Sequence, residues 1–237
     1  FEGEHPVSKL LFERAAEPWL RSLPSLQALG FLEQIYRAGL KAREAAIAAQ
    51  DGRDFHVFFR EPEIAVDDAF VLSIRFIEPM SRNARALGVN SLSISEPRKA
   101  LLQTLKSGAP VASGPFRLTQ ESGVQTGVVV YQRVRGAEGQ QGVAFATLRM
   151  GDALADMTAK LPRSLEYCLL DQGRELMAGS QRCASWPPGR PRVYSTSIAQ
   201  ATRQWELRII AAPDAAVYGT GLRADRSTSP IFAASGM

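Results

Sequence analysis

Residues 70–134 read FVLSIRFIEPMSRNARALGVNSLSISEPRKALLQTLKSGAPVASGPFRLTQESGVQTGVVVYQRV. Runs rich in Val, Ile, Phe and Thr predict strands, because such side chains fit a half-buried pleated surface. The expected elements are strands and two helices, in the order 70–77 (strand), 80–87 and 95–107 (helices), 111–118 and 127–134 (strands). Antiparallel strands with helices over one face predict an α+β unit. No usual catalytic constellation lies here, which favours a pocket that holds a molecule without reacting with it.

The longer of the two helices, 95–107, is clearly delimited. We expect Ser95 to accept a hydrogen bond from a free amide of the first turn, as an N-cap does. Pro97 is tolerated in that turn because its missing donor would be unpaired anyway. Gly108 fits the left-handed position that ends many helices. The core face is expected to consist of Leu101, Leu102 and Leu105.

The N-terminal part is expected to be mainly helical. Leu29, Leu32 and Tyr36 recur at helical spacing. Proline at positions 18 and 24 interrupts the pattern, since its ring removes a donor and clashes with the previous turn. We therefore predict one helix that ends near residue 23 and a second from 25 to about 49. Strands at 55–59 and 142–149 complete the central part.

Residues 152–213 repeat the same theme on a smaller scale. A short helix is expected around Leu154, Met157 and Leu161, and Pro162 ends it. Strands are predicted at 166–170, 174–178, 192–198 and 204–211. A turn at 171–173 separates the first two of these strands, and the Pro- and Gly-rich residues 186–191 form a loop. These elements predict a second, smaller lobe.

Composition bounds the possible functions. The chain has 237 residues, of which 45% are hydrophobic, so it can bury one elaborate core or two small ones, and we expect two domains. Its net charge is +4, but the basic residues are scattered, which favours a solvated surface over a nucleic-acid groove. No apolar run reaches the ~18 residues that a transmembrane helix requires.

Residues for catalysis or metal binding are sparse. The only histidines are His5 and His56, and no cysteine lies near either, so the ligand spacings of zinc sites are absent. Glu78 and Glu96 are a possible carboxylate pair, but a loop position and a helix's first turn explain them better. We predict no catalytic residue, no metal and no cofactor, and expect that the chain is not an enzyme.

Two cysteines, Cys168 and Cys183, lie across the predicted hairpin of the smaller lobe. A disulfide that closes a loop of about 15 residues contributes about 3 kcal/mol in the chain-entropy model. Such bonds persist in oxidising compartments such as the periplasm. The alternative is a pair of ordinary buried thiols. Cys168 and Cys183 are therefore a disulfide candidate.

A series of short motifs gives the chain a family resemblance. They are Ile-Glu-Pro-Met at 77–80, Asn83, Ala-Leu-Gly at 86–88, Ser-x-Ser-x-Pro-Arg at 93–98 and Ser-Gly-Pro-Phe-Arg-Leu at 113–118. In this order they resemble the CHASE family of extracytoplasmic sensor domains. The resemblance is densest over 70–134, weaker over 27–49, and thin after residue 154.

The resemblance implies a fold, a domain order and a location. The fold class is α+β, with a long N-terminal helical stalk followed by two PAS-like antiparallel-sheet lobes. The expected divisions are stalk and packing helices at 1–50 and a membrane-distal ligand-binding lobe at 51–150. A membrane-proximal lobe follows at 151–215, and residues 216–237 form a segment leading to a transmembrane helix. The whole receptor would sit in the inner (plasma) membrane through helices that flank this chain, with this domain in the periplasm.

The resemblance also implies a ligand site in the first lobe, between the sheet and the helices that lead into it. Thr119 falls where a backbone group meets an adenine ring, Tyr131 where a hydroxyl meets the ligand's tail, and Phe145 and Thr147 on the strand that closes the floor. The full set of implied ligand-binding residues is Ser91, Glu96, Phe116, Leu118, Thr119, Val129, Tyr131, Phe145 and Thr147.

One position departs from the receptors of the cytokinin type. Those receptors place a carboxylate in the turn that opens the long helix, where it accepts from an exocyclic amine. Here that position is Pro97, and Glu96 is its neighbour. Glu96 can take this role only if the turn rotates, because a neighbouring side chain normally points elsewhere. Arg98 would favour an acidic ligand, and the alternative is that it is an ordinary element of the family pattern.

The resulting functional expectation is a sensory domain of a transmembrane receptor, expected to be a histidine kinase. It would bind a small planar ligand such as a cytokinin-like adenine derivative. It would form a homodimer through its N-terminal helices, and it would not bind nucleic acid. The alternatives are a CHASE-type sensor of a diguanylate cyclase with another small ligand, and a periplasmic protein-interaction domain whose pocket is closed.

Overall fold

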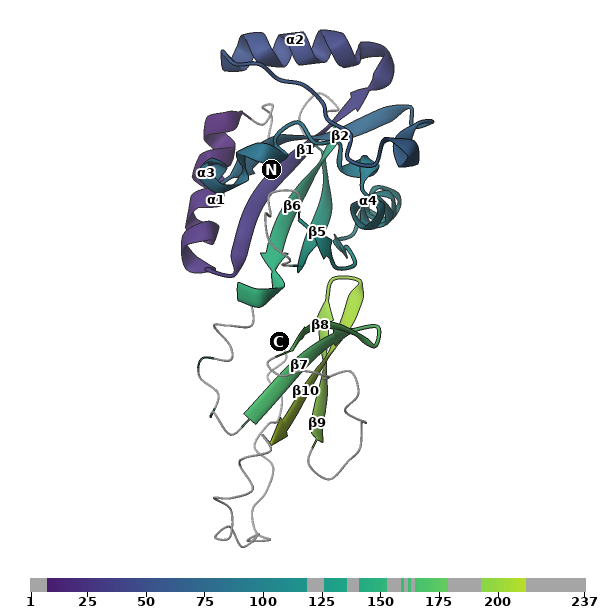
Figure 1. Ribbon diagram of the computed structural model, residues 1–237. Helices are drawn as coiled ribbons and strands as arrows, with labels where there is room; N and C mark the ends of the chain where they lie inside the picture. The colour runs from purple at the N-terminus through teal and green to yellow at the C-terminus, as the bar shows by residue number, and fades with distance from the viewer. Residues whose placement is uncertain are drawn as a thin grey trace, which may run out of the picture.

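The computed structural model describes residues 8–118, 126–135, 141–152, 165–178 and 193–211, together with 159 and 162. These residues form two antiparallel sheets, one above the other in Figure 1. We call residues 8–152 the distal lobe and residues 165–211 the proximal lobe. The expected α+β class with two antiparallel-sheet lobes is confirmed.

The sheet of the distal lobe has six strands in the order β2-β1-β6-β5-β3, and β4 also pairs with β5. All of these pairs are antiparallel. The strands are β1 (Leu26–Tyr36), β2 (Phe70–Glu78), β3 (Val111–Ala112), β4 (Phe116–Arg117), β5 (Thr126–Arg135) and β6 (Gln141–Arg149). Strands β2, β5 and β6 agree with the sequence prediction to within one or two residues.

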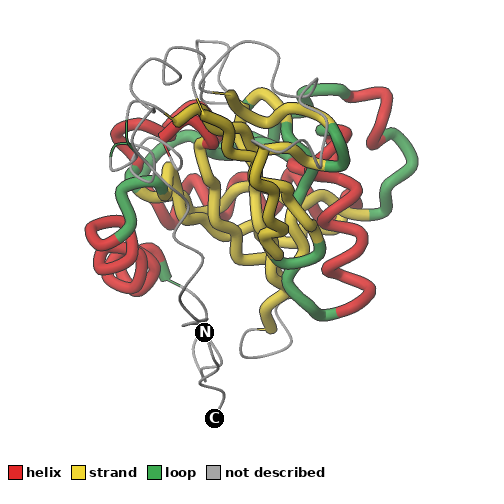
Figure 2. The backbone as a smooth tube through the Cα atoms, turned by 90° about the horizontal axis from the view of Figure 1, so that it is seen from below, coloured by secondary structure: helices red, strands yellow, loops and turns green. Residues whose placement is uncertain are grey.

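Helices cover both faces of this sheet (Figure 2). On one face, α1 (Lys9–Ser22) packs Phe12 and Ala16 against Phe76, and α2 (Leu40–Asp51) packs Ile47 against the far end of the sheet. The other face carries α3 (Met80–Asn83), the 3-10 turns Ala84–Ala86 and Ser91–Ser93, and α4 (Ser95–Ser107). The largest buried cluster lies on this second face and includes Leu32, Leu72 and Leu101.

Helix α4 begins and ends at the predicted residues, but its first turn is capped differently. Gly108 is left-handed at φ 73°, as expected for the residue that ends the helix. Ser95 is not the N-cap, because the helix already includes it. Its hydroxyl donates to the Glu61 carboxylate at 2.7 Å, and that carboxylate also accepts from the Ser95 amide at 3.5 Å. The carboxylate of Glu61, a loop residue, therefore pairs with the first residue of α4 in place of an N-cap side chain.

The predicted helix from 25 to about 49 is wrong in its first half. Residues 26–36 form β1, which lies between β2 and β6, and only residues 40–51 are helical. Because β1 is covered on both faces, it buries residues on both, including Leu32 and Ile35. Such a strand lacks the apolar-polar alternation of a half-buried one. The predicted long stalk is also not shown, since α1 has 14 residues.

Two other strand predictions need correction. Residues 55–59 do not form a strand, and Phe58 makes only an isolated bridge to Val89. Residues 111–118 form two short strands, β3 and β4, and between them the Ser113 hydroxyl accepts from the Val129 amide at 3.0 Å. That bond replaces a ladder contact where the chain turns between the two strands.

The proximal lobe is a four-stranded sheet in the order β8-β7-β10-β9. Its strands are β7 (Leu165–Asp171), β8 (Arg174–Ala178), β9 (Val193–Gln200) and β10 (Arg203–Ala211). The predicted turn at 171–173 is confirmed. Gln172 and Gly173 both have positive φ, at 50° and 76°, as a two-residue hairpin requires. The loop at 186–191, the segment 216–237 and all of the predicted helix at 154–161 except residue 159 lie outside the described residues.

An apolar cluster joins the two lobes. Ala112, Val128 and Met150 of the distal lobe pack against side chains of the proximal lobe, namely Leu169, Leu176 and Trp205. Val130 and Leu148 extend the cluster on the distal side. We call these residues the interlobe cluster. Among the described residues, no helix is long and apolar enough to span a membrane.

Candidate functional site

A small cavity lies inside the distal lobe, between the sheet and the layer that contains α4. Its volume is about 30 Å³. Seven of the nine residues predicted from the sequence line it: Ser91, Phe116, Leu118, Val129, Tyr131, Phe145 and Thr147. Of the other two, Glu96 is not among the lining residues and Thr119 lies outside the described residues.

Strand register explains why four of these residues meet. β5 and β6 are paired so that Val129 lies opposite Thr147, and Tyr131 opposite Phe145. Because side chains alternate between the faces of a sheet, these four share one face, and Val128 and Leu148 point to the other. The rings of Tyr131 and Phe145 lie 6.2 Å apart, tilted by 50°. The floor of the cavity is therefore a regular piece of sheet.

Gly30 of β1 makes room for the ring of Phe145. The two residues are register partners, and a Cβ added at Gly30 would overlap three carbon atoms of the Phe145 ring. A rigid ring cannot yield as the end of a flexible chain can. Gly30 is thus part of the site's construction although it carries no side chain.

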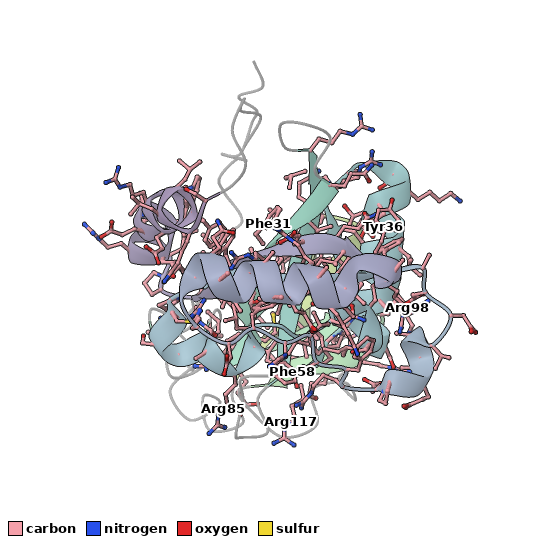
Figure 3. The ribbon with its side chains drawn as sticks, turned by 90° about the horizontal axis from the view of Figure 1, so that it is seen from above. Phe31, Tyr36, Phe58, Arg85, Arg98 and Arg117 are labelled. Atoms are coloured by element: carbon pink, nitrogen blue, oxygen red, sulfur yellow. The ribbon has the colours of Figure 1, made fainter. Side chains whose placement is uncertain are left out.

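Residues from β4 close one side of the cavity. Phe116 faces inward, and Arg117, the next residue, points outward at the rim of the lobe (Figure 3). β4 is attached to the sheet only by the pairs Phe116 with Gly127 and Arg117 with Thr126. A two-residue strand gives this side fewer backbone contacts than β5 and β6 give the floor.

The wall opposite the floor comes from residues 86–97, and polar contacts fix it. Asn90 is fully buried, and its side-chain oxygen accepts from the amides of Leu72 and Leu92 at 3.0 and 3.2 Å. The Ser93 hydroxyl donates to the Asn90 carbonyl at 2.7 Å. These bonds attach the wall to β2, because Leu72 belongs to that strand.

An ion pair holds the start of α4 in addition. Arg98 donates to both carboxylate oxygens of Asp68, at 2.5 and 2.7 Å. The pair raises the pKa of Arg98, since the hydrogen bond to Asp68 favours the charged guanidinium. Arg98 lies at the side of the distal lobe in Figure 3, and it does not line the cavity. Its role is therefore to fix α4, and an acidic ligand in this cavity is not supported.

Three hydroxyl groups give the cavity its polar character. Ser91, Tyr131 and Thr147 are buried, with exposures of 4%, 3% and 2%, and within the described part of the chain their side chains form no hydrogen bond. Burial raises the pKa of the Tyr131 phenol, so this group stays a neutral donor. Unpaired hydroxyls beside an apolar cavity are suited to orient a bound molecule.

The prediction for Glu96 is corrected by its position on α4. Its carboxylate lies against Gly114, where a Cβ would overlap one of its oxygens, and it pairs with Lys99 at 2.5 Å. The next residue, Pro97, faces inward and lines the cavity. Neighbouring residues on a helix point about 100° apart, so Glu96 cannot replace a carboxylate at position 97. Among the described residues, all lining side chains are uncharged.

The cavity is small compared with sites for organic ligands. A water molecule requires about 10–15 Å³ by this measure, so 30 Å³ holds about two. Ligand pockets usually measure about 300–1,000 Å³. A molecule of the usual ligand size could enter only if lining side chains or strands moved.

Sequence reasoning missed six lining residues: Ile74, Ile77, Ala86, Val89, Ile94 and Pro97. Ile74 and Ile77 lie on β2, whose residues 71–77 are all buried, so alternation could not show which of them face the cavity. Ala86, Val89 and Ile94 lie in short turns without a regular period. The motif Ser-x-Ser-x-Pro-Arg was the available signal for this wall.

The structure describes one of the two cysteines of the predicted disulfide. Cys168 on β7 is fully buried and is disulfide-bonded. Cys183, the only other cysteine of the sequence, lies outside the described residues. The geometry of the bond is therefore not described.

Comparison with known proteins gives one family match. A family model described as "CHASE domain" matches residues 5–179. No curated protein matches the chain.

Several solved structures share the fold at low sequence identity. The periplasmic sensory domain of the Campylobacter jejuni chemoreceptor Tlp1 has a TM-score of 0.52 at 11% identity, covering 93% of this chain and 85% of that one. The ligand-binding domain of the Pseudomonas aeruginosa PAO1 amino acid chemoreceptor PctC, in complex with GABA, gives 0.50 at 12%, with 88% and 83% covered. A "Methyl-accepting Chemotaxis protein X" gives 0.50 at 15%, with 86% and 81% covered. At these identities the likeness concerns the fold alone.

Proposed function

The chain belongs to the CHASE family of extracytoplasmic sensor domains, and from this premise we propose that the distal cavity is the ligand site of a transmembrane receptor. The observation that carries the proposal is the group of three unpartnered hydroxyls, of Ser91, Tyr131 and Thr147, in an otherwise apolar cavity. All three residues line the cavity, and none of their oxygens is among the fully enclosed, unpaired polar atoms of the described residues. A ligand that takes the place of water in the cavity could therefore be oriented by these hydroxyls.

The chemistry of the cavity favours an uncharged, flat and mainly apolar ligand. No described side chain in the lining carries a charge, so nothing there balances an ammonium or a carboxylate group. The PctC domain was solved with GABA, which is a zwitterion, and an amino acid of that kind is not what this lining fits. An adenine derivative with an apolar tail, of the cytokinin kind, has the required shape and hydrogen-bonding groups. Without a carboxylate at position 97, its exocyclic amine would have to meet a hydroxyl.

Binding would act as a population shift. The closed cavity of about 30 Å³ represents the ligand-free state, and a ligand would stabilise an expanded one. Only the difference in affinity for the two states can drive a signal. The domain itself would perform no catalysis, and the output would come from a histidine kinase or a nucleotide cyclase elsewhere in the receptor.

Dimerisation through α1 is the second part of the proposal. Four large apolar side chains at this end of the chain are exposed: Leu10, Leu11, Trp19 and Leu23. An apolar groove of about 230 Å³ lies between α1 and the sheet, beside Trp19. A second copy of α1 would cover these side chains, and apolar patches of this kind commonly mark interfaces. Sedimentation of Trp19→Glu, which should be more monomeric than wild type, tests this contact.

One observation favours a different function. The cavity is far smaller than a usual ligand site, as expected of a protein-interaction domain whose pocket is packed shut. In that case the apolar surface of α1 would contact another periplasmic protein. The two functions differ in whether a small molecule binds inside the distal lobe.

Calorimetric titration with isopentenyladenine, zeatin and adenine decides between them. We expect binding of the two substituted adenines and weaker binding of adenine itself. Thr147→Trp fills the cavity and should abolish binding. The control is Leu102→Trp. Leu102 was expected on the core face of α4 but is 45% exposed, so the same side chain placed there should leave binding as in wild type. Equal binding by both variants would place the ligand elsewhere, and no binding by the wild type would favour the interaction domain.

A further inference from the structure

The floor of the cavity is also one side of the contact between the lobes. On β5 and β6, Val129 and Thr147 line the cavity, and their neighbours Val128 and Leu148 belong to the interlobe cluster. Val128 is fully buried and is the register partner of Leu148. A single layer of sheet, formed by β5 and β6, therefore separates the cavity from the proximal lobe.

The two walls of the cavity differ in how they are held. The wall formed by residues 86–97 is attached by directional bonds, including the bonds of Asn90 to the amides of Leu72 and Leu92 and the pair of Arg98 with Asp68. The outer side of the floor meets apolar side chains. Apolar contact is not directional, so it re-packs at lower cost than a hydrogen-bonded wall breaks. The floor can shift as a unit against this apolar contact with the β5–β6 ladder intact, so of these two walls the floor should move when the cavity expands.

The interlobe cluster contains a polar group that is not satisfied. Trp205 is 7% exposed, and its buried indole Nε1 has no hydrogen-bond partner among the residues that the structure describes. An unpaired buried donor is costly, and native structures contain few of them. A shift of the contact that lets water reach this N–H would recover part of that cost. The unpaired indole N–H therefore lowers the cost of a second packing arrangement of the interlobe cluster.

We propose that β5 and β6 couple the two sites: a ligand that widens the distal cavity shifts these strands toward the proximal lobe and re-packs the interlobe cluster at Trp205. This inference rests on the proposed function of the cavity as a ligand site. By linkage, any change that eases movement of the strands also tightens ligand binding. The coupling is reciprocal: ligand binding in the cavity changes the interlobe contact, and a change in that contact alters the affinity for the ligand.

The first experiment needs no ligand. The chain has three tryptophans, and replacing Trp19 and Trp186 by Phe leaves Trp205 as the only source of indole emission. In this background, Thr147→Met enlarges a side chain on the cavity floor and should shift the emission to longer wavelength, because water reaches the indole. Val71→Met is the control. Val and Thr have nearly the same shape, and Val71 is buried against α2, away from the floor.

An unchanged spectrum for Thr147→Met, or an equal shift for Val71→Met, overturns the coupling. If thermal unfolding shows that Thr147→Met does not fold, Ser91→Met fills the same cavity from the opposite wall and is read in the same way.

The second experiment uses isopentenyladenine as the probe. Leu176→Ala makes room on the proximal side of the interlobe cluster, so the probe should bind at least about fivefold more tightly, the lower end of common coupling strengths. Leu170→Ala removes another buried leucine of the same lobe, 1% exposed against 8% for Leu176, that lies outside the cluster, and it should leave the affinity within about twofold. Equal affinities of the two variants overturn the coupling. If wild type does not bind the probe, the ligand assignment fails, and the emission of Thr147→Met still decides the coupling.

Discussion

Gly30→Ala should damage the floor of the cavity although it adds only one methyl group. Gly30 lies on β1 opposite Phe145, and the added Cβ would overlap the Cζ and both Cε atoms of the Phe145 ring. The ring is 7% exposed and contacts Tyr131 on its other side. It must therefore move into the cavity, or the two strands must separate.

The net cost follows from two opposing effects. Forcing extra volume into a packed core costs about 1–3 kcal/mol. Replacing Gly by Ala gains about 0.4–1 kcal/mol, because the unfolded chain has less freedom to lose. We expect a net destabilisation of about 1–2 kcal/mol. For a protein of this size each kcal/mol lowers the Tm by about 2–4 °C, so the Tm should fall by about 2–8 °C.

Urea unfolding and thermal scans measure this effect, with Gly39→Ala as the control. Nothing lies within 4 Å of a Cβ added at Gly39, and its φ is −105°, so that variant should stay within about 1 kcal/mol of wild type. The smaller side chain in Phe145→Leu should partly rescue Gly30→Ala, with a coupling energy of about 0.5–3 kcal/mol. If Gly30→Ala is as stable as the control, or the double variant is simply additive, the ring does not depend on Gly30 and the reasoning is refuted.

Two further changes test the polar contacts that hold the distal lobe. Asp51→Ala removes the nearest partner of Arg75, at 2.5 Å, and leaves this 3%-exposed guanidinium with Glu33 at 3.8 Å and Gln50 at 3.4 Å, so it should lower the free energy of unfolding by at most about 3 kcal/mol in urea. The hydrogen bond from Arg75 holds the pKa of Asp51 below its usual value, so stability present near neutral pH is lost as pH falls below about 4, and Asp51→Asn should flatten this acid slope. Asn90→Ala unpairs the buried amides of Leu72 and Leu92 and should cost about 2–4 kcal/mol, whereas a cost below 1 kcal/mol would mean that water replaces the side chain.

Much of the fold was accessible from local signals. Strands β5 and β6 were predicted because they are rich in Val, Phe and Thr, and helix α4 because its ends are clear, such as the left-handed Gly108. β1 was not, because a strand covered on both faces shows no alternation and its apolar spacing imitated a helix. Gly30 was the signal against a helix there, since glycine in a helix interior is unfavourable by about 1 kcal/mol.

The candidate site shows the same division. Tyr131, Phe145 and Thr147 were predicted from a motif order that resembles the CHASE family, and the register of β5 with β6 brings them together. The role considered for Glu96 failed, because the direction of a side chain at a helix start depends on how the helix is set against the sheet. Here Glu61 and the Arg98 pair fix that setting.

By itself, the sequence indicated the antiparallel α+β class through its residue periods along the chain. The order of its motifs indicated the family and, through that resemblance, most of the residues on the cavity floor. The tertiary structure alone decided that the cavity is closed to about 30 Å³, that Pro97 and not Glu96 faces it, and that its floor also contacts the proximal lobe. Each of these depends on distances between elements far apart in the chain. Packing sets such distances, and no local pattern of residues records them.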